Sequence, residues 1–422
     1  NYKCEYCYLR ENCNIYPTEV DKPELIISNL KLLCNYLIEK KYCIPDIELF
    51  SGEIWHTNFG REILEILYQA CLNGLQCKHF LIPSNCTFAN DDAALHLIQR
   101  FIDKFEQIGV TLQFSVSMDG KVIDDYNRPA NDKDEVRNDL FYDNIFLFAH
   151  RNGFTFHPMV AAYTIEQWKE NFQWWKEMCD KYEYDVIHDV MLLEVRNNDW
   201  TEEKIQSYCD FLEFIFMNQL TDEKDKNKRG HFINSLLGRD LSPDEVAGGY
   251  LPYYLVPTKT FASCTIANNL TIRLGDLAIC PCHRTAYKEL LYGYFQVENG
   301  SIVGIVSNNI YNAVHLLLGN EHVCHIKCDS CIYAPFCIRN CYGAQFETNN
   351  DMFLPVESVC KFFEAKYKKI CELYEQHGIV EQLQAIIPTD LYFPNAQKIL
   401  NFIKGVKENA SLPKKKEERI YC

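Results

Sequence analysis

The sequence predicts an α/β protein in which a partial (β/α)6 barrel is followed by a cysteine-rich domain. Three observations lead to this prediction. Short apolar runs typical of strands alternate with helical patterns as far as Asn218, a charged run at 222–228 then breaks the alternation, and short-spaced cysteines gather beyond it. Strands separated by helices of a dozen or more residues form parallel sheets, so the first part predicts about six repeated β/α units.

The expected elements follow from hydrophobic periodicity. Strands are predicted at 46–50, 80–82, 111–116, 154–160 and 190–195, and helices at 23–41, 61–72, 91–108, 165–181 and 201–218. In such sheets the chemistry lies beyond the carboxyl ends of the strands. Glu53, Ser117, Asp119 and the loop with Cys4 and Cys7 are expected there.

Composition narrows the class of protein. The 422 residues carry a net charge of −16, from 42 basic and 58 acidic residues, which disfavours nonspecific binding to nucleic acid or to anionic membranes. No apolar run approaches the length of a membrane span. The 21 cysteines are grouped at short spacings, which favours metal or cluster ligation in a reducing compartment over a disulfide framework. A cytoplasmic location is therefore expected.

Seven cysteines between 264 and 360 form the most specific pattern of the chain. Four of them have the spacing C-x2-C-x5-C-x3-C, two precede these around Gly275, and one follows; they are Cys264, Cys280, Cys328, Cys331, Cys337, Cys341 and Cys360. Thiolates at such spacings can share a metal ion or an iron–sulfur cluster. Seven are too many for one site with four ligands and one short of two such sites.

The first residues hold a separate pair of cysteines. Cys4-Glu-Tyr6-Cys7 resembles the last two cysteines of the radical SAM motif C-x3-C-x2-C, whose first cysteine is expected immediately before Asn1. The resemblance implies that this loop ligates a [4Fe–4S] cluster, that S-adenosylmethionine (SAM) chelates its free iron, and that Tyr6 lies against the adenine. On spacing alone, half of a structural zinc site fits the pair equally well.

Two further stretches are similar to motifs of the same family. Ser51-Gly52-Glu53 is similar to the GGE motif, with Ser in place of the first Gly, and implies contacts to the SAM amino group. The stretch from residue 115 to 128 is similar to SxDG followed by D-x2-R, and the resemblance implies contacts to the SAM ribose and carboxylate. Its expected contact residues are Ser115, Ser117, Asp119 and Arg128. Taken alone, each stretch also fits an ordinary turn at a strand end.

The seven-cysteine pattern, including Gly275, matches the SPASM extension of radical SAM enzymes. The resemblance implies two auxiliary [4Fe–4S] clusters, and therefore three clusters in all. One would be ligated by Cys328, Cys331, Cys337 and Cys360. The other would be ligated by Cys264, Cys280 and Cys341, with either an open iron or Cys282 or Cys324 as the fourth ligand. The alternative is a pair of structural zinc sites.

The domain organisation follows from these motifs. We expect the radical SAM partial barrel over 1–230, with its N-terminal part preceding this sequence, and a linker over 231–256. A SPASM domain of short β-hairpins and helices is expected over 257–375, and a helical tail over 376–422.

The resemblance implies a peptide-modifying enzyme. It would use a 5′-deoxyadenosyl radical to take a hydrogen from a ribosomally made precursor peptide and would form a thioether or carbon–carbon crosslink, with flavodoxin or ferredoxin as reductant. Two alternatives within the family are formylglycine formation, as in anaerobic sulfatase maturation, and peptide epimerisation with a thiol donor such as Cys282 or Cys324. The alternative outside it is a non-catalytic, zinc- or cluster-stabilised binding protein. No general base is assigned.

Overall fold

The protein is described from a computed structural model. The described residues are 2–11, 22–50, 52–56, 59–131, 135–184, 186, 189–221, 266, 270–308, 328, 331 and 341–377. Several predicted features lie outside them. These are Ser51, Cys264, Cys324, Cys337, the linker 231–256 and nearly all of the tail 376–422.

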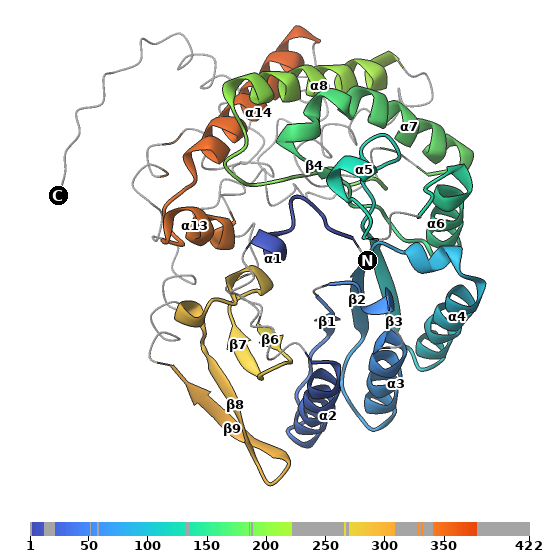
Figure 1. The fold of residues 1–422 in the computed structure, drawn as a ribbon, viewed down its shortest axis with the longest axis vertical. Helices are drawn as coiled ribbons and strands as arrows, with labels where there is room; N and C mark the ends of the chain where they lie inside the picture. The colour runs from blue at the N-terminus through green and yellow to red at the C-terminus, as the bar shows by residue number, and fades with distance from the viewer. Residues whose placement is uncertain are drawn as a thin grey trace, which may run out of the picture.

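Parallel strands form the first half of the molecule (Figure 1). Strands β1 (Asp46–Glu48), β2 (His79–Ser84) and β3 (Thr111–Val116) make a parallel sheet in that order. Parallel bridges from Val116 to Phe156 and from Phe156 to Val190 carry the arrangement on to the parallel pair β4 (Met159–Val160) and β5 (Leu193–Glu194). The prediction of an α/β fold with parallel strands is confirmed.

Helices alternate with these strands. The longer ones are α2 (Pro23–Glu39), α3 (Phe59–Leu72), α4 (Asp92–Gln107), α6 (Asp139–Asn152), α7 (Trp168–Lys181) and α8 (Glu202–Thr221). Shorter pieces are α1 (Tyr8–Glu11), α5 (Asp124–Asn127) and the 3₁₀ turns η1 (Ile54–His56), η2 (Thr87–Asn90) and η3 (Ala162–Gln167). Helix α6, which the sequence analysis did not predict, begins with the Asn138 side chain accepting the amide of Phe141 and ends at Gly153 with φ of 66°. Both are typical helix caps.

The two faces of the parallel sheet differ in character. Phe80, Ile82, Phe114 and Val116 alternate along β2 and β3 and are completely buried. Burying one such side chain contributes about 1.5–3 kcal/mol, so this face anchors the helices that cover it. On the opposite face, Leu81, Gln113 and Ser115 are partly buried. One face of the sheet is therefore an apolar core, and the other is mixed, with polar side chains such as Gln113 and Ser115 beside Leu81.

The second half contains an antiparallel sheet in the order β6-β7-β8-β9. Its strands are β6 (Thr271–Arg273), β7 (Ala278–Cys280), β8 (Gly293–Glu298) and β9 (Ser301–Ser307), and the turns η6 (His283–Thr285) and η7 (Lys288–Leu290) join β7 to β8. Asn299 and Gly300, both with positive φ, make the two-residue turn between β8 and β9, as the right-handed twist of a hairpin favours. Helices α13 (Tyr342–Asn349) and α14 (Glu357–Gln376) follow.

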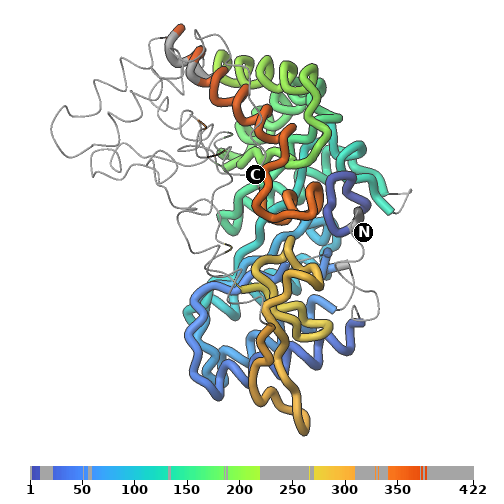
Figure 2. The backbone as a smooth tube through the Cα atoms, turned by 90° about the vertical axis from the view of Figure 1, so that its left-hand side faces the viewer, coloured from blue at the N-terminus to red at the C-terminus, as the bar shows by residue number. Residues whose placement is uncertain are grey.

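The two halves share one hydrophobic core. Helix α14 lies along α8 (Figures 1 and 2), and Phe362 of α14 contacts Trp200 and Tyr208 with ring centroids 4.3 and 4.6 Å apart. On the other side, the Asn29 amide of α2 donates to the Leu274 carbonyl at 2.6 Å. The predicted boundary between the two domains stays a prediction. No helix in the described part of the chain is long and apolar enough to span a membrane.

Candidate functional site

The loop with Cys4 and Cys7 lies beside the segment that follows β3. The amide of Cys7 donates to the Cys4 carbonyl at 3.1 Å, which closes a turn between the two cysteines. On either side of Cys4, the amides of Lys3 and Glu5 donate to the carbonyls of residues 129 and 127, both at 2.9 Å. The backbone itself therefore holds the cysteine loop against the turn after β3.

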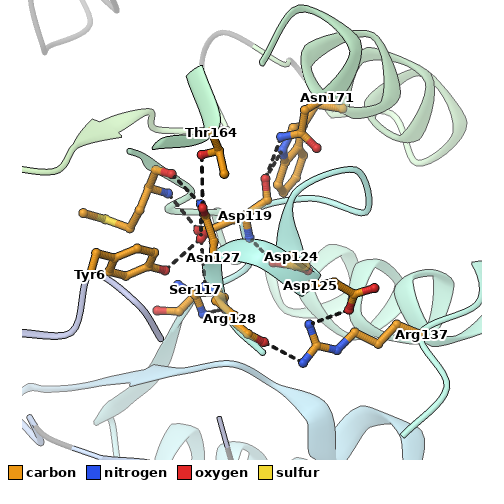
Figure 3. A network of polar contacts seen from close by, with 12 residues as sticks. Tyr6, Ser117, Asp119, Asp124, Asp125, Asn127, Arg128, Arg137, Thr164 and Asn171 are labelled. Atoms are coloured by element: carbon orange, nitrogen blue, oxygen red, sulfur yellow. Dashed lines mark hydrogen bonds and ion pairs between the residues drawn. The ribbon is translucent and has the colours of Figure 1, made fainter. Parts of the chain in front are cut away.

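One buried carboxylate binds this loop through the Tyr6 side chain (Figure 3). The Tyr6 hydroxyl donates to Asp119 Oδ2 at 2.8 Å, and the Asn127 side-chain amide donates to the same oxygen at 2.9 Å. The other oxygen, Oδ1, accepts the backbone amide of Met159 at 2.8 Å. Asp119 is completely buried. Its carboxylate joins the cysteine loop, α5 and β4, and we call these contacts, together with Arg128, the Asp119 network.

Arg128 completes the Asp119 network. Its Nε lies 3.2 Å from Asp119 Oδ2, its Nη1 donates to the Ser117 carbonyl, and its guanidinium carbon lies 5.7 Å from the centre of the Tyr6 ring. Burial alone would lower the pKa of Arg128, but the charge of Asp119 raises it well above its usual value. Burial raises the pKa of the Cys4 thiol, and the Arg128 charge opposes that shift. Four predicted residues (Tyr6, Ser117, Asp119 and Arg128) thus meet beside Cys4.

Two side chains of α7 bind the backbone of the turn that contains Asp119. The Asp119 carbonyl accepts the Asn171 side-chain amide at 2.7 Å and the Trp175 indole at 3.1 Å, both from α7. Gly120 has φ of +108°, and a Cβ there would lie 2.5 Å from Asn171 Oδ1 and 2.7 Å from Trp175 Nε1. Only glycine fits this backbone conformation and this space.

The sequence analysis missed the side chains that complete the Asp119 network. These are Asn127, Thr164 and Asn171; Thr164 donates to Asn127 Oδ1 at 3.1 Å. Asn127 directly precedes Arg128 in the motif-like stretch 115–128, and this position could have identified it as a site residue. Nothing local in the sequence marks Thr164 or Asn171, because they reach the site from η3 and α7.

Glu53 lies at the end of β1, in a second buried position. Its carboxylate accepts the Ser84 hydroxyl at 3.0 Å, the Asn85 amide at 2.9 Å and the Trp55 amide at 3.2 Å. Burial raises the pKa of Glu53, and these donors oppose the shift. The preceding Gly52 has φ of +63°, a conformation that favours glycine. The predicted Gly52-Glu53 turn is therefore built across the carboxyl ends of β1 and β2.

Ser115 lies on β3 and contacts a histidine instead of Asp119. Its hydroxyl lies 2.7 Å from Nδ1 of His157, the residue after the bridge between β3 and the next strand. Burial lowers the pKa of His157, so the imidazole is neutral at pH 7. The side chain of Ser115 thus has a partner of its own and is not part of the Asp119 network.

The described cysteines of the second group lie on separate elements. Cys280 is completely buried in β7, and burial raises its pKa to about 12; Cys341 precedes α13, and Cys360 is exposed on α14. The Cys331 amide donates to the Cys328 carbonyl at 3.2 Å, so these two form a turn. Among the described residues, no three His, Cys, Asp or Glu side chains gather as a metal site.

An aromatic contact connects the first cysteine loop to the second half of the chain. The His283 ring stacks on Phe50 with centroids 3.7 Å apart and lies 5.9 Å from the Tyr8 ring. Arg284 lies over the Tyr8 ring at 5.2 Å and binds Glu347 of α13 through Nη2 at 2.6 Å and Nε at 3.0 Å. Tyr8 therefore lies between the Cys4–Cys7 loop and the turn that follows Cys280.

Two buried donors at the site have no hydrogen-bond partner among the described residues. They are Nε of Arg128, whose contact with Asp119 is an ion pair without hydrogen-bond geometry, and the indole Nε1 of Trp55 beside Glu53. An unsatisfied buried donor costs about 1–3 kcal/mol, so a ligand with acceptor groups would offset this cost. The thiols of Cys4 and Cys7 suit iron. These residues fit a cluster and an anionic, polar ligand beside it.

Comparisons with known proteins point to one fold. No protein-family model matches the chain, and no curated protein matches its sequence. The solved structure of native anSMEcpe with bound AdoMet is similar, with a TM-score of 0.56, 15% sequence identity and coverage of 95% of this chain and 96% of that one. The same enzyme with AdoMet and Kp18Cys peptide (TM-score 0.54, 15% identity, 95% and 96%) or Cp18Cys peptide (0.53, 15%, 96% and 96%) is also similar.

The chain has the fold of these enzymes. Structures of anSME, an anaerobic sulfatase-maturating enzyme, contain a radical SAM domain and a SPASM domain. The resemblance drawn from the cysteine spacings is therefore confirmed at the level of the fold, over nearly the whole length of the chain.

Proposed function

We propose that the protein is a radical SAM enzyme that modifies a peptide side chain by oxidation. The observation that carries the proposal is the position of the Cys4–Cys7 loop, which is bound through Tyr6 to Asp119 and Arg128 at the carboxyl edge of parallel strands. Ligands of open parallel sheets bind at this edge. The strands β1 to β5, with their helices, would form the predicted partial (β/α)6 barrel of residues 1–230.

The residues around the loop support a SAM site. Cys4 and Cys7, with a cysteine upstream, would ligate a [4Fe–4S] cluster. Arg128, held in its charged form by Asp119, would bind the SAM carboxylate, and Glu53 would accept from its amino group. When bound and reduced, SAM and its cluster supply a carbon radical that removes a hydrogen atom from the substrate. Residues 51, 52, 115 and 117 would complete the predicted site.

The second cysteine group supports a SPASM domain, predicted over 257–375. Two auxiliary [4Fe–4S] clusters, three in all, would be ligated by Cys328, Cys331, Cys337 and Cys360 and by Cys264, Cys280 and Cys341. The contact of Tyr8 with the turn after Cys280 would keep the two cysteine regions in a fixed relation. A reductant such as flavodoxin or ferredoxin would supply electrons, in the cytoplasm.

The substrate would be a precursor peptide, and the product a thioether or carbon–carbon crosslink. A second candidate reaction is formylglycine formation, because the similar structures are of anSMEcpe with bound peptides. Both reactions oxidise a side chain by two electrons. The same fold can support either reaction, so the fold does not distinguish between the two.

Metal content and SAM cleavage test the enzyme class. Anaerobically purified full-length protein is expected to contain iron and sulfide and to cleave SAM when reduced. We expect Cys4→Ala and Cys7→Ala to abolish cleavage, whereas Cys43→Ala, a change at an exposed cysteine outside the site, should leave it unchanged. Zinc without sulfide, or full SAM cleavage by the first two variants, would overturn the proposal.

The mass of a co-expressed peptide tests the reaction. A crosslink lowers the mass of the peptide by two hydrogens and forms no aldehyde, whereas formylglycine contains an aldehyde that reacts with a hydrazide probe. An unchanged mass with one deuterium gained from heavy water at each site would identify an epimerase instead. The peptide to use is the one encoded by the short reading frame nearest the gene.

A further inference from the structure

The carboxylate of Asp119 is enclosed by protein partners. Its two oxygens receive the Tyr6 hydroxyl, the Asn127 amide, the Met159 backbone amide and the charge of Arg128, all within 3.2 Å. Three of the roughly four acceptor positions of a carboxylate thus hold hydrogen bonds from protein groups. The side chain is also completely buried. A bound molecule could reach Asp119 only by displacing one of these partners.

The partners of Asp119 converge on the cysteine loop. Tyr6 stands between the two cysteines, and the flanking amides of Lys3 and Glu5 bind the backbone next to Asn127. Tyr2 continues this contact with an antiparallel bridge to Ala130. The loop is thus attached to 127–130 by its backbone, and Tyr6 is its one side chain that the figure shows reaching the buried carboxylate (Figure 3).

We infer that Asp119 is a positioning residue that sets the conformation of the Cys4–Cys7 loop through the Tyr6 hydroxyl and orients the Arg128 guanidinium beside it. For its effect on SAM, this inference rests on the proposed function. It assigns Asp119 no contact with SAM. Asp119 would affect the cofactor indirectly, because it holds the loop that carries Cys4 and Cys7 and orients Arg128.

Physical chemistry explains why a carboxylate is needed here. Arg128 is buried and Tyr6 is partly buried, so each needs a partner that replaces water. A neutral acceptor would satisfy the hydroxyl but would leave the guanidinium charge uncompensated. Hydrogen bonds to an ionised group are roughly twice as strong as those between neutral groups. Asp119 meets both needs with one group, and so couples the loop to the cation.

The test compares two substitutions that preserve shape. Asp119→Asn keeps the size of the side chain but removes its charge, and Tyr6→Phe removes only the hydroxyl. Matched controls are Asp180→Asn on α7 and Tyr126→Phe on α5, which make the same changes at exposed positions. Hydrogen–deuterium exchange of the amides of residues 2–7 is measured relative to those of β2, in the full chain without cluster or SAM. SAM affinity and the electron paramagnetic resonance spectrum of the reduced cluster are measured in the loaded protein.

We expect both site variants to speed amide exchange in the loop by about tenfold to a hundredfold, as loss of a charge-assisted hydrogen bond implies. The double variant should show less than the sum of the two effects on a logarithmic scale, because both break the same contact. Both should also change the spectrum of the cluster with SAM, and the controls should change nothing. If Asp119→Asn does not fold, Tyr6→Phe alone decides the outcome.

A different pattern would overturn the inference. If Asp119→Asn weakens SAM binding while loop exchange stays at the wild-type rate, Asp119 contacts the cofactor directly. Wild-type exchange in Tyr6→Phe would likewise rule out the hydroxyl as the link. If the wild-type protein binds neither cluster nor SAM, the proposed function fails, yet the exchange measurement still decides whether Asp119 positions the loop.

Discussion

The two cysteine regions of the molecule are held in different ways. Cys4 and Cys7 lie on one short loop, which its own backbone attaches to residues 127–130 and which the buried Asp119 carboxylate connects to β4. The described cysteines of the second group lie on β7, before α13, on α14 and in a short turn, and the elements around them are joined by separate ion pairs. One of these is Arg284 with Glu347.

This difference predicts which substitutions should disturb each of the two cysteine regions. Buried polar groups that bind one common carboxylate support one another. The Asp119 network therefore holds the first loop as part of the sheet. Ion pairs between distant elements, such as Glu194 of β5 with Lys366 of α14, instead fix the elements relative to one another. We expect the first region to be sensitive to any change within the one compact network, and the second to loss of individual ion pairs.

The largest effect is expected at the turn that supports Asp119. Gly120→Ala combines a backbone strained at φ of +108° with a Cβ only 2.5 Å from Asn171 Oδ1, and should lower the free energy of unfolding by roughly 4 kcal/mol. Gly153→Ala separates the two causes, because Gly153 has φ of +66° but nothing within 4 Å of the added Cβ; it should cost about 1 kcal/mol. Urea titrations of both variants measure this. Equal losses would mean that the packing around Asp119 is not tight.

The next effect concerns the ion pair that holds α14. Glu194 accepts from Lys366 at 2.5 Å and from the Tyr208 hydroxyl at 2.6 Å, and both charged side chains are about nine-tenths buried. Lys366→Met leaves the carboxylate buried without its cation and should destabilise the protein by about 3 kcal/mol. Lys369→Met removes the cation from the more exposed pair with Glu213 and should cost less than about 1 kcal/mol. If chemical denaturation gives similar values for the two variants, the Glu194 pair does not anchor the helix.

The same comparison explains how far the sequence could predict the structure. The alternation of strands and helices and the order of the motifs were enough to predict that Ser117, Asp119 and the Cys4–Cys7 loop lie at one edge of the sheet. The buried residues of helix α6, among them Phe141, Tyr142, Ile145, Phe146 and Phe148, lie on one side of the helix. The helix was missed because Leu140 and Leu147, which are apolar and exposed on the other side, weaken the contrast between an apolar and a polar face.

Side-chain roles were harder to predict than positions. Asp119 was predicted as a SAM contact from its motif, and only the structure shows four partners on its carboxylate. Two of these, the Tyr6 hydroxyl and the Met159 amide, are 113 and 40 residues away in sequence. Contacts at such separations depend on how the strands associate, which periodicity does not specify. Arg284 and Glu347, which lie in the segments that follow Cys280 and Cys341, bind each other although they are 63 residues apart in sequence.

The most gradual effect is expected on the pH dependence of stability, and it separates two buried carboxyl groups. Burial and the neighbouring Asp119 carboxylate raise the pKa of Asp124 to about 7, whereas Lys366 lowers the pKa of Glu194 in spite of its burial. Asp124 ionises near pH 4 in the unfolded chain, so between about pH 4 and 7 the folded state binds more protons. The stabilisation from Asp124 is thus present below about pH 4 and is lost as the pH rises through about 7.

Asp124→Asn removes this titration and keeps an oxygen that can accept the Asp119 amide, which donates to Asp124 Oδ1 at 2.9 Å. Urea titrations between pH 4 and 8 should show that the stability of the variant relative to wild type rises with pH, by at most about 1.4 kcal/mol per pH unit. Asp125→Asn, at a side chain that is 82% exposed, should keep the wild-type slope. A parallel pair of curves for Asp124→Asn and wild type would mean that Asp124 is already ionised in the folded protein, in which case Arg128 and Arg137 would have to compensate two buried carboxylates in the Asp119 region instead of one.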